Sequence, residues 1–441
     1  MSRRVTAAAA LALLASACSW SRFDEVSDHA PVEVLERPSA LKAGFGNVVA
    51  VAVHGEEVRA LVGGVPLASP GATFELGFDE RPGVQAVSAL VCESKGARAC
   101  FLATQPAGLG KLLLRGEEQE RCFAVGLGRD ESTTGLLLRC GTMSFVQQVP
   151  EVAEAAITEV FENAAEPPEL FAASDRQEAP ALLAAAPRVK SSWFYPPQES
   201  LPQELVPARA PGEQYGRAVA VVGISGGRIF AVGDPGRGEV WLYRWLGEEP
   251  EVLGCLGGAA GLGRSLAAGR VDEDDEEELI VADNGAVWVL RGAALAAAAP
   301  APEEPCGADW LPEGAELDRF TCDDVEGSYA CEGSEFGAAL AVADLDGDGT
   351  GEVIVGAPGM SAAGKEKTGA VLVYDWTPAG GAAFADLRLL SSSTGGSRFG
   401  AALAVAPQRG REVILAGAPG ANKAALIYCS DLFTGESPRC R

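Results

Sequence analysis

The sequence predicts an all-β protein, a six- to seven-bladed β-propeller of four-stranded antiparallel blades with a partly helical and irregular insert. Three observations lead to this prediction. One pattern of strands and turns occurs four times in the second half of the chain. Glycine and proline are frequent, with 54 and 27 among 441 residues, which is typical of a chain with many turns. The apolar runs between those turns are short, as strands are.

The repeats begin near Tyr215, Leu262, Phe336 and Phe399. Each has an aromatic residue or leucine followed by glycine, a small-residue apolar run, a turn, a second apolar run, a G-A-P-like turn and a third strand. Candidate fourth strands follow, such as GCLGG after the first copy and LRLLSSS after the third. Such a sheet cannot bury both faces alone, so we expect the copies to stack around one axis as blades.

The first half of the chain shows the pattern more weakly. Residues 41–148 contain one Phe45-Gly46 pair and several short strand candidates, and we assign them to degenerate blades. Residues 149–212 are predicted to be an insert or linker with a short helix, because Val152, Ile157, Val160 and Phe161 have helical spacing. Residues 213–441 are assigned to the C-terminal blades of the same propeller. The segment from Ala297 to Cys331 is predicted to be a second insertion.

The N-terminus has the features of an export signal. Arg3 and Arg4 precede a short apolar run, and residues 1–17 are assigned to a signal peptide. The sequence LASAC resembles a bacterial lipobox, in which Cys18 would carry the lipid; Ala15-Ser16-Ala17 is also a plain cleavage site. We therefore expect an outer-membrane lipoprotein that faces the periplasm or the cell surface. The alternative is a soluble periplasmic or secreted protein.

Residues 18–40 are assigned to a lipid tether and a candidate ring-closing strand. The last repeat has only a short tail after its third strand, whereas PVEVLERP near the N-terminus has strand-like alternation. We expect Val32 and Val34 to lie beside the strand from Ala425 to Tyr428, which would leave no open sheet edge.

The charge of the chain restricts its partners. Acidic residues outnumber basic ones by 61 to 35, for a net charge of −26, which argues against nucleic acid and an anionic membrane surface. We expect a protein or glycan ligand, with membrane attachment only through the lipid.

The chain has only two histidines, His29 and His54, which removes most zinc sites and histidine-dependent catalytic groups. No catalytic constellation is found, so we predict a protein that is not an enzyme. The alternative is a propeller-based enzyme, such as a calcium-dependent polysaccharide lyase or hydrolase. Trp241, Tyr243 and Trp245 alternate along one strand, where they either pack between blades or form an exposed ligand platform.

Eleven cysteines occur, and ten remain if Cys18 takes lipid. An even number in an exported protein indicates disulfides. Close spacing on neighbouring strands predicts four pairs, and the two remaining cysteines form a fifth: Cys92–Cys100, Cys122–Cys140, Cys322–Cys331, Cys429–Cys440 and Cys255–Cys306.

The stretch DLDGDGTGE carries alternating aspartates at Asp344, Asp346 and Asp348, a spacing suited to a hard cation. It is not an EF-hand, because position twelve would be Val355, inside a predicted strand. A solvated acidic turn is the competing interpretation.

Two copies carry motifs that resemble the FG-GAP repeat, a family that builds the propeller of integrin alpha chains and occurs in bacterial envelope proteins. The motifs are Phe336-Gly337 with Gly356-Ala357-Pro358, and Phe399-Gly400 with Gly417-Ala418-Pro419. The resemblance extends in weaker form over residues 214–429. It implies a non-catalytic, calcium-stabilised scaffold at the cell envelope.

The resemblance also implies a ligand set for the acidic loop. Asp344, Asp346 and Asp348 would donate carboxylate oxygens, Thr350 its backbone carbonyl, and Glu352 would close the shell. The equivalent loop one copy earlier, RVDEDDEEE, has Arg270 in place of the first aspartate. It retains Asp272, Asp274 and Glu278, so it is either a degenerate second calcium site or a charged, solvated turn.

Overall fold

The computed structural model describes most of the chain from residue 203 onward and mainly strands before it. The described residues are 32–36, 41–54, 57–66, 87–88, 90–92, 98–102, 112–116, 122–129, 134–140, 143–148, 157–159, 170–173, 182–187, 189–195, 203–247, 249–300, 306, 314–322, 329–330, 332–345, 349–362, 364–377, 381–390, 395–408 and 411–428. The predicted signal peptide, Cys18 and His29 lie outside them, as do Cys331, Cys429 and Cys440.

The predicted repeats form four-stranded antiparallel sheets. The first copy gives β16 (Val219–Ile224), β17 (Gly227–Asp234), β18 (Glu239–Trp245) and β19 (Glu251–Gly257). The second gives β20 (Ser265–Gly269), β21 (Glu278–Ala282), β22 (Ala286–Leu290) and β23 (Glu316–Thr321), and the third β25 (Ala339–Ala343), β26 (Glu352–Ala357), β28 (Ala370–Thr377) and β29 (Gly381–Leu390). The fourth gives β30 (Leu403–Gln408), β31 (Arg411–Ala418) and β32 (Lys423–Tyr428). A two-stranded sheet of β24 (Tyr329–Ala330) and β27 (Ser361–Ala362) lies beside the third copy.

The first half of the chain is also built of strands. One sheet contains β2 (Leu41–His54), β3 (Glu57–Pro66) and β4 (Val87–Ser88), and another β5 (Leu90–Cys92), β6 (Arg98–Leu102) and β7 (Leu112–Gly116). Two four-stranded sheets follow. The first consists of β8 (Cys122–Arg129), β9 (Thr134–Cys140), β10 (Met143–Gln148) and β11 (Ile157–Glu159). The second consists of β12 (Leu170–Ala173), β13 (Leu182–Ala186), β14 (Ser191–Tyr195) and β15 (Gln203–Glu204).

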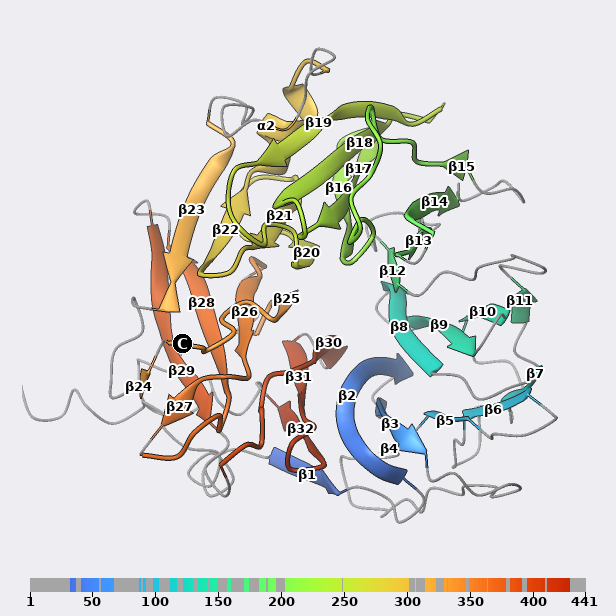
Figure 1. The fold of residues 1–441 in the computed structure, drawn as a ribbon, viewed down its shortest axis with the longest axis vertical. Helices are drawn as coiled ribbons and strands as arrows, with labels where there is room; N and C mark the ends of the chain where they lie inside the picture. The colour runs from blue at the N-terminus through green and yellow to red at the C-terminus, as the bar shows by residue number, and fades with distance from the viewer. Residues whose placement is uncertain are drawn as a thin grey trace, which may run out of the picture.

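The sheets stand around a common centre, with the first strand of each repeat nearest to it (Figure 1). The core lies in the seams between neighbouring sheets. One buried cluster joins β16–β19 to β20–β22, and the next joins β20–β23 to β25–β28. The fold is thus all-β with propeller-like blades, as the sequence predicts.

The glycines of the repeat motifs explain how neighbouring sheets approach so closely. Gly400, after the aromatic residue of the fourth copy, has a positive φ of 83°, a conformation that favours glycine. A Cβ on Gly356 of the preceding copy would overlap the carbonyl oxygen of Gly400. The same overlap links Gly417 of the last copy to Gly46 near the N-terminus. The G-A-P turn of one repeat and the aromatic-glycine pair of the next therefore form the two sides of one backbone contact.

The N-terminal strand closes the last sheet, as predicted. β1 (Val32–Glu36) pairs antiparallel with β32, with Val32 opposite Ile427 and Val34 opposite Ala425. The strand order of this sheet is β1-β32-β31-β30, and Figure 1 shows β1 at its edge. Glu36 also forms an ion pair of 2.8 Å with Lys423. The two ends of the chain are therefore joined in one sheet.

The prediction of a loop and helix over residues 149–212 is wrong for the described part of that range. Ile157–Glu159 is strand β11, and β12–β15 form a complete sheet. Leu183, Ala184, Ala185 and Phe194 in that sheet are fully buried. Alanine has low strand propensity, so the local sequence favoured the other interpretation, and packing between sheets overrides it.

The second predicted insertion, Ala297 to Cys331, is an insertion only in part, because it contains a strand of the sheet. It follows α2 (Gly292–Ala297), the one helix among the described residues, but it also supplies β23 as the fourth strand beside β22. In the part of the chain that the structure describes, no helix has the length and apolar character needed to cross a membrane.

Candidate metal centre

The loop between β25 and β26 is partly described. The backbone N–H of Leu345 donates to Glu352 Oε2 at 2.6 Å, and that of Gly349 donates to Asp344 Oδ2 at 3.0 Å. Glu352 is buried at the first position of β26. Gly349 has a φ of 94°, a conformation that favours glycine. Asp346 and Asp348 lie outside the described residues, so their geometry stays a prediction.

The loop between β20 and β21 is fully described and brings the predicted second set together. One carboxylate oxygen each of Asp272, Asp274 and Glu278 lies within 4.8 Å of the others. Asp274 is half-buried and Asp272 is only 9% exposed, whereas Glu278 begins β21 and is fully buried. Three converging carboxylates repel one another unless a cation or protons compensate.

Glu278 holds the same position as Glu352 does in the next copy. Its Oε2 accepts from the N–H of Val271 at 2.8 Å, seven residues earlier, as Glu352 accepts from Leu345. Its other oxygen, Oε1, is buried and has no hydrogen-bond partner. Burial raises the pKa of Glu278 to about 8; the backbone N–H groups of Val271 and Gly292 oppose this, and the charges of Asp272 and Asp274 add to it. The second oxygen of this carboxylate is thus available to a ligand.

The two aspartates shape the loop as well as facing Glu278. Asp272 Oδ1 accepts from the N–H of Asp274 at 2.9 Å, and Asp274 Oδ1 accepts from Glu276 at 2.7 Å. Burial raises the pKa of Asp272, with the N–H of Asp274 acting against it. Arg291 Nε lies 3.8 Å from Asp272 Oδ2, which offsets part of the negative charge. These turns direct the aspartate oxygens to the side on which Glu278 lies.

Three other charged residues of this loop bind neighbouring sheets. Glu277 Oε2 accepts from the N–H of Gly223 in β16, and Glu276 Oε2 accepts from the N–H of Ser225 in the turn that follows. Arg270, which replaces the first aspartate, donates to the carbonyl of Gly349 in the next acidic loop. Its cationic group therefore points out of its own loop, which removes one objection to a cation there.

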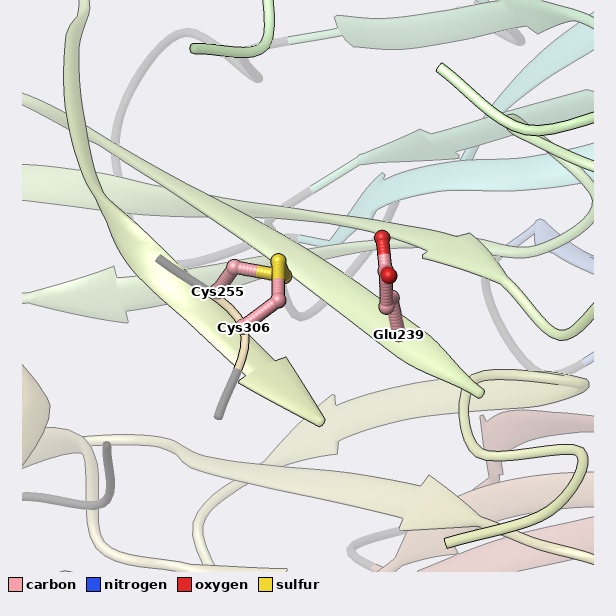
Figure 2. Close-up of side chains that lie close together, drawn as sticks. All are labelled: Glu239, Cys255 and Cys306. Carbon is pink, nitrogen blue, oxygen red and sulfur yellow. A yellow bond between two sulfur atoms is a disulfide. The ribbon is translucent and has the colours of Figure 1, made fainter. Parts of the chain in front are cut away.

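A second group of metal-binding residue types consists of a disulfide and the glutamate beside it. Cys255 and Cys306 are bonded, as predicted, and one Glu239 oxygen lies within 4.8 Å of both sulfurs (Figure 2). Nothing in the sequence reasoning pointed to Glu239. Comparing the repeats could have revealed it. Glu239 begins β18, whereas the equivalent strand of the third copy, β28, begins with the apolar residue Ala370.

For the other four predicted disulfides, the structure describes both cysteines of two pairs, one cysteine of a third pair and neither cysteine of the fourth. Cys92 lies opposite Cys100, and Cys122 opposite Cys140, in the strand registers. Cys322 is disulfide-bonded, while its predicted partner Cys331 lies outside the described residues. The pairing of these cysteines and of Cys429 with Cys440 stays a prediction.

The alternating aromatic residues of β18 pack between sheets. Trp241 and Tyr243 are buried, and the Tyr243 hydroxyl lies 2.9 Å from that of Tyr215 on the turn before β16. Burial raises the pKa of Tyr215 to about 12, while its hydrogen bonds to Ser192 and Tyr243 act against the rise. Trp241 and Tyr243 therefore form no exposed platform.

Comparison with known proteins identifies one repeat. Residues 336–374 match the family model of the FG-GAP repeat, so the chain carries such a repeat, and the match includes the loop before Glu352. No curated protein matches the chain. Among solved structures, the crystal structure of Chaetomium thermophilum Raptor is similar, with 14% identity and a TM-score of 0.46 over 77% of this chain and 26% of that one. The chain spans about a quarter of the length of that protein.

Proposed function

We propose that this protein is a non-catalytic, calcium-stabilised β-propeller scaffold at the bacterial cell envelope that binds a protein or glycan partner. The observation that carries the calcium part is the meeting of Asp272, Asp274 and Glu278, with a buried Glu278 oxygen that has no hydrogen-bond partner. The FG-GAP repeat supports the scaffold part, because such repeats build binding platforms rather than catalytic centres.

The proposed propeller has seven blades. The support is a closed series of contacts between the first strands of seven sheets, a ring that does not include the first strand of the β5–β7 sheet. In this series β2 contacts β8, β8 contacts β12, β12 contacts β16, β16 contacts β20, β20 contacts β25, β25 contacts β30, and β30 contacts β2. A closed ring protects the strand edges that an open array would expose. The clasp of β1 on β32 fits the same arrangement.

Two loops would hold calcium in this proposal. Asp272, Asp274 and Glu278 form one set, and Asp344, Asp346, Asp348, Thr350 and Glu352 form the other. A bound cation would offset the repulsion of the carboxylates and the cost of burying Glu278. Since Arg270 links the first loop to Gly349 of the second, the described parts of the two loops meet at the seam between two sheets. Calcium would therefore stabilise the contact between blades.

The envelope location rests on the N-terminal sequence. The charged and apolar residues before Cys18 support export, and Cys18 supports lipid attachment. The disulfide between Cys255 and Cys306 agrees with an oxidising compartment. The net charge of −26 favours a partner with a basic or neutral binding surface over nucleic acid.

A pull-down from envelope extracts tests the scaffold function. The full-length protein is expected to retain a specific protein or glycan with calcium and to lose it with a calcium chelator. Asp274→Asn should weaken retention in calcium, whereas Glu251→Gln, on an exposed side chain that pairs with Arg244 and belongs to neither acidic loop, should not. Equal retention with calcium and with chelator would contradict a calcium-dependent scaffold, and turnover of an envelope polysaccharide would favour the enzyme alternative.

A further inference from the structure

The disulfide beside Glu239 occupies a buried position between two sheets. Cys255 lies in β19 directly opposite Trp241 of β18, and Glu239 lies opposite Gly257 in the same register. The backbone carbonyl of Cys306 lies 3.2 Å from the position of a Cβ on Gly257. Cys306 thus covers the strand next to Glu239, and Cys255 is fully buried while Cys306 is half-buried.

Glu239 has one oxygen in use and one that is not. Arg209 pairs with Oε1, while Oε2 is buried and accepts no hydrogen bond. The residue as a whole is only 6% exposed. Burial raises the pKa of Glu239, and the charges of Arg209 and Arg237 act against the rise. An acid kept in such a place without a full set of partners is costly unless a ligand or a proton completes it.

The corresponding residues of another repeat show that an acid is not needed for the fold at this position. The hairpin residues Asp234 and Glu239 are register partners in the first copy. The third copy has Ala357 opposite Ala370 at the same place, and both are fully buried. Asp283 of the second copy is a useful contrast, because its oxygens accept from Gly285, Ala286 and the Trp288 indole. Among the described residues, the first copy alone has an acid beside two cysteines.

We propose that, when the disulfide is reduced, Cys255, Cys306 and Glu239 form a site for a thiophilic divalent metal ion of the zinc class. Glu239 Oε2 would be the oxygen ligand, and Arg209 would hold the other oxygen and fix the carboxylate. One oxygen of Glu239 and both sulfurs already lie within 4.8 Å of one another. Ligand atoms around one tetrahedral zinc ion are roughly 3.3–3.8 Å apart, so small side-chain rotations would suffice.

The charges and electrons of this switch balance. A dithiol reductant gives two electrons and two protons to the Cys255–Cys306 bond and becomes a disulfide itself. Metal binding then releases the two thiol protons to solvent. Two thiolates, one carboxylate, the divalent ion and the Arg209 guanidinium sum to zero charge, which suits a buried site. A water molecule would take the fourth position.

The test uses the full-length protein, reduced with a phosphine under argon and titrated with Co²⁺ as the spectroscopic probe for zinc. We expect a thiolate-to-cobalt charge-transfer band that is absent before reduction. In peptide-resolved alkylation, Co²⁺ or Zn²⁺ should slow modification of Cys255 and Cys306 by about tenfold or more. Because each cysteine is read separately, reduction of the other disulfides does not obscure the result.

Three variants make the assignment specific. Cys255→Ser/Cys306→Ser should lose the band, and Glu239→Gln should weaken cobalt binding by about tenfold. Glu251→Gln is the matched control, because Glu251 pairs with Arg244 on the same sheet without neighbouring sulfurs, and it should bind as the unchanged protein does. Unchanged alkylation of Cys255 and Cys306 with metal, equal binding by Glu239→Gln, or unfolding on reduction despite the metal would each overturn the proposal.

Discussion

Deleting residues 19–38 is expected to destabilise the sheet of β30–β32 strongly. The deletion removes β1, which pairs along its five residues with β32 and buries Leu35. Loss of one buried leucine alone costs about 2–5 kcal/mol, and the exposed edge of β32 adds to this. We expect a loss of about 3 kcal/mol or more in the free energy of unfolding, measured by chemical denaturation, with earlier proteolysis near Tyr428.

Deleting only residues 19–30 is the matched control. It shortens the segment before β1 and leaves all five paired residues in place. This shorter deletion should keep both the stability and the protease resistance of the unchanged protein. If the longer deletion behaves like the shorter one, the β1–β32 pairing does not hold the ends together, and another segment must close the sheet.

Glu278→Gln is expected to change stability in opposite directions without and with calcium. The folded-state pKa of Glu278 is about 8, above the ordinary value of 4.5 for a glutamate. The stability linked to this raised pKa is present below about pH 4.5 and is lost as pH rises through about 8, where the buried carboxyl must ionise. At about pH 9 without calcium, the neutral glutamine should therefore unfold at a higher temperature.

With calcium the order should reverse, because the amide is a weaker ligand than the carboxylate. One calcium site at a hundredfold excess of calcium over its Kd stabilises a protein by about 2.7 kcal/mol. Glu278→Gln should lose most of the stabilisation that calcium gives through the loop of Asp272, Asp274 and Glu278. Glu276→Gln is the control, because Glu276 lies in the same loop but binds Ser225. A calcium shift of the melting temperature that Glu278→Gln leaves intact would show that this carboxylate is not a ligand.

The repeats and the pairing of β1 with β32 could be predicted from the sequence, because both depend on local patterns of residues that form strands and turns. Gly356-Ala357-Pro358 of one copy and Phe399-Gly400 of the next mark a place where two backbones meet, so the order of these motifs reveals the strand order. The alternation of Val32 and Val34, together with the missing fourth strand of the last copy, indicated which strand closes the sheet. The register with β32 then followed from the fold.

The same reasoning failed for residues 149–212 because their strands carry little local signal. The run Leu182–Ala186 is LLAAA, and its burial comes from neighbouring sheets rather than from its own pattern. Glu239 and Arg209 were also missed, because an ion pair 30 residues apart has no sequence spacing that marks it. The acidic loops could be predicted as candidate metal sites because their acidic residues lie within one short segment.

Calorimetric titration of the chelator-treated full-length protein with calcium tests the central claim most directly. We expect two calcium ions per chain, and one in Asp348→Ala or in Glu278→Gln. A stoichiometry of two that falls to one in each variant would assign one ion to each acidic loop. No calcium binding by the unchanged protein, or binding that neither variant reduces, would contradict a propeller stabilised by calcium at these loops.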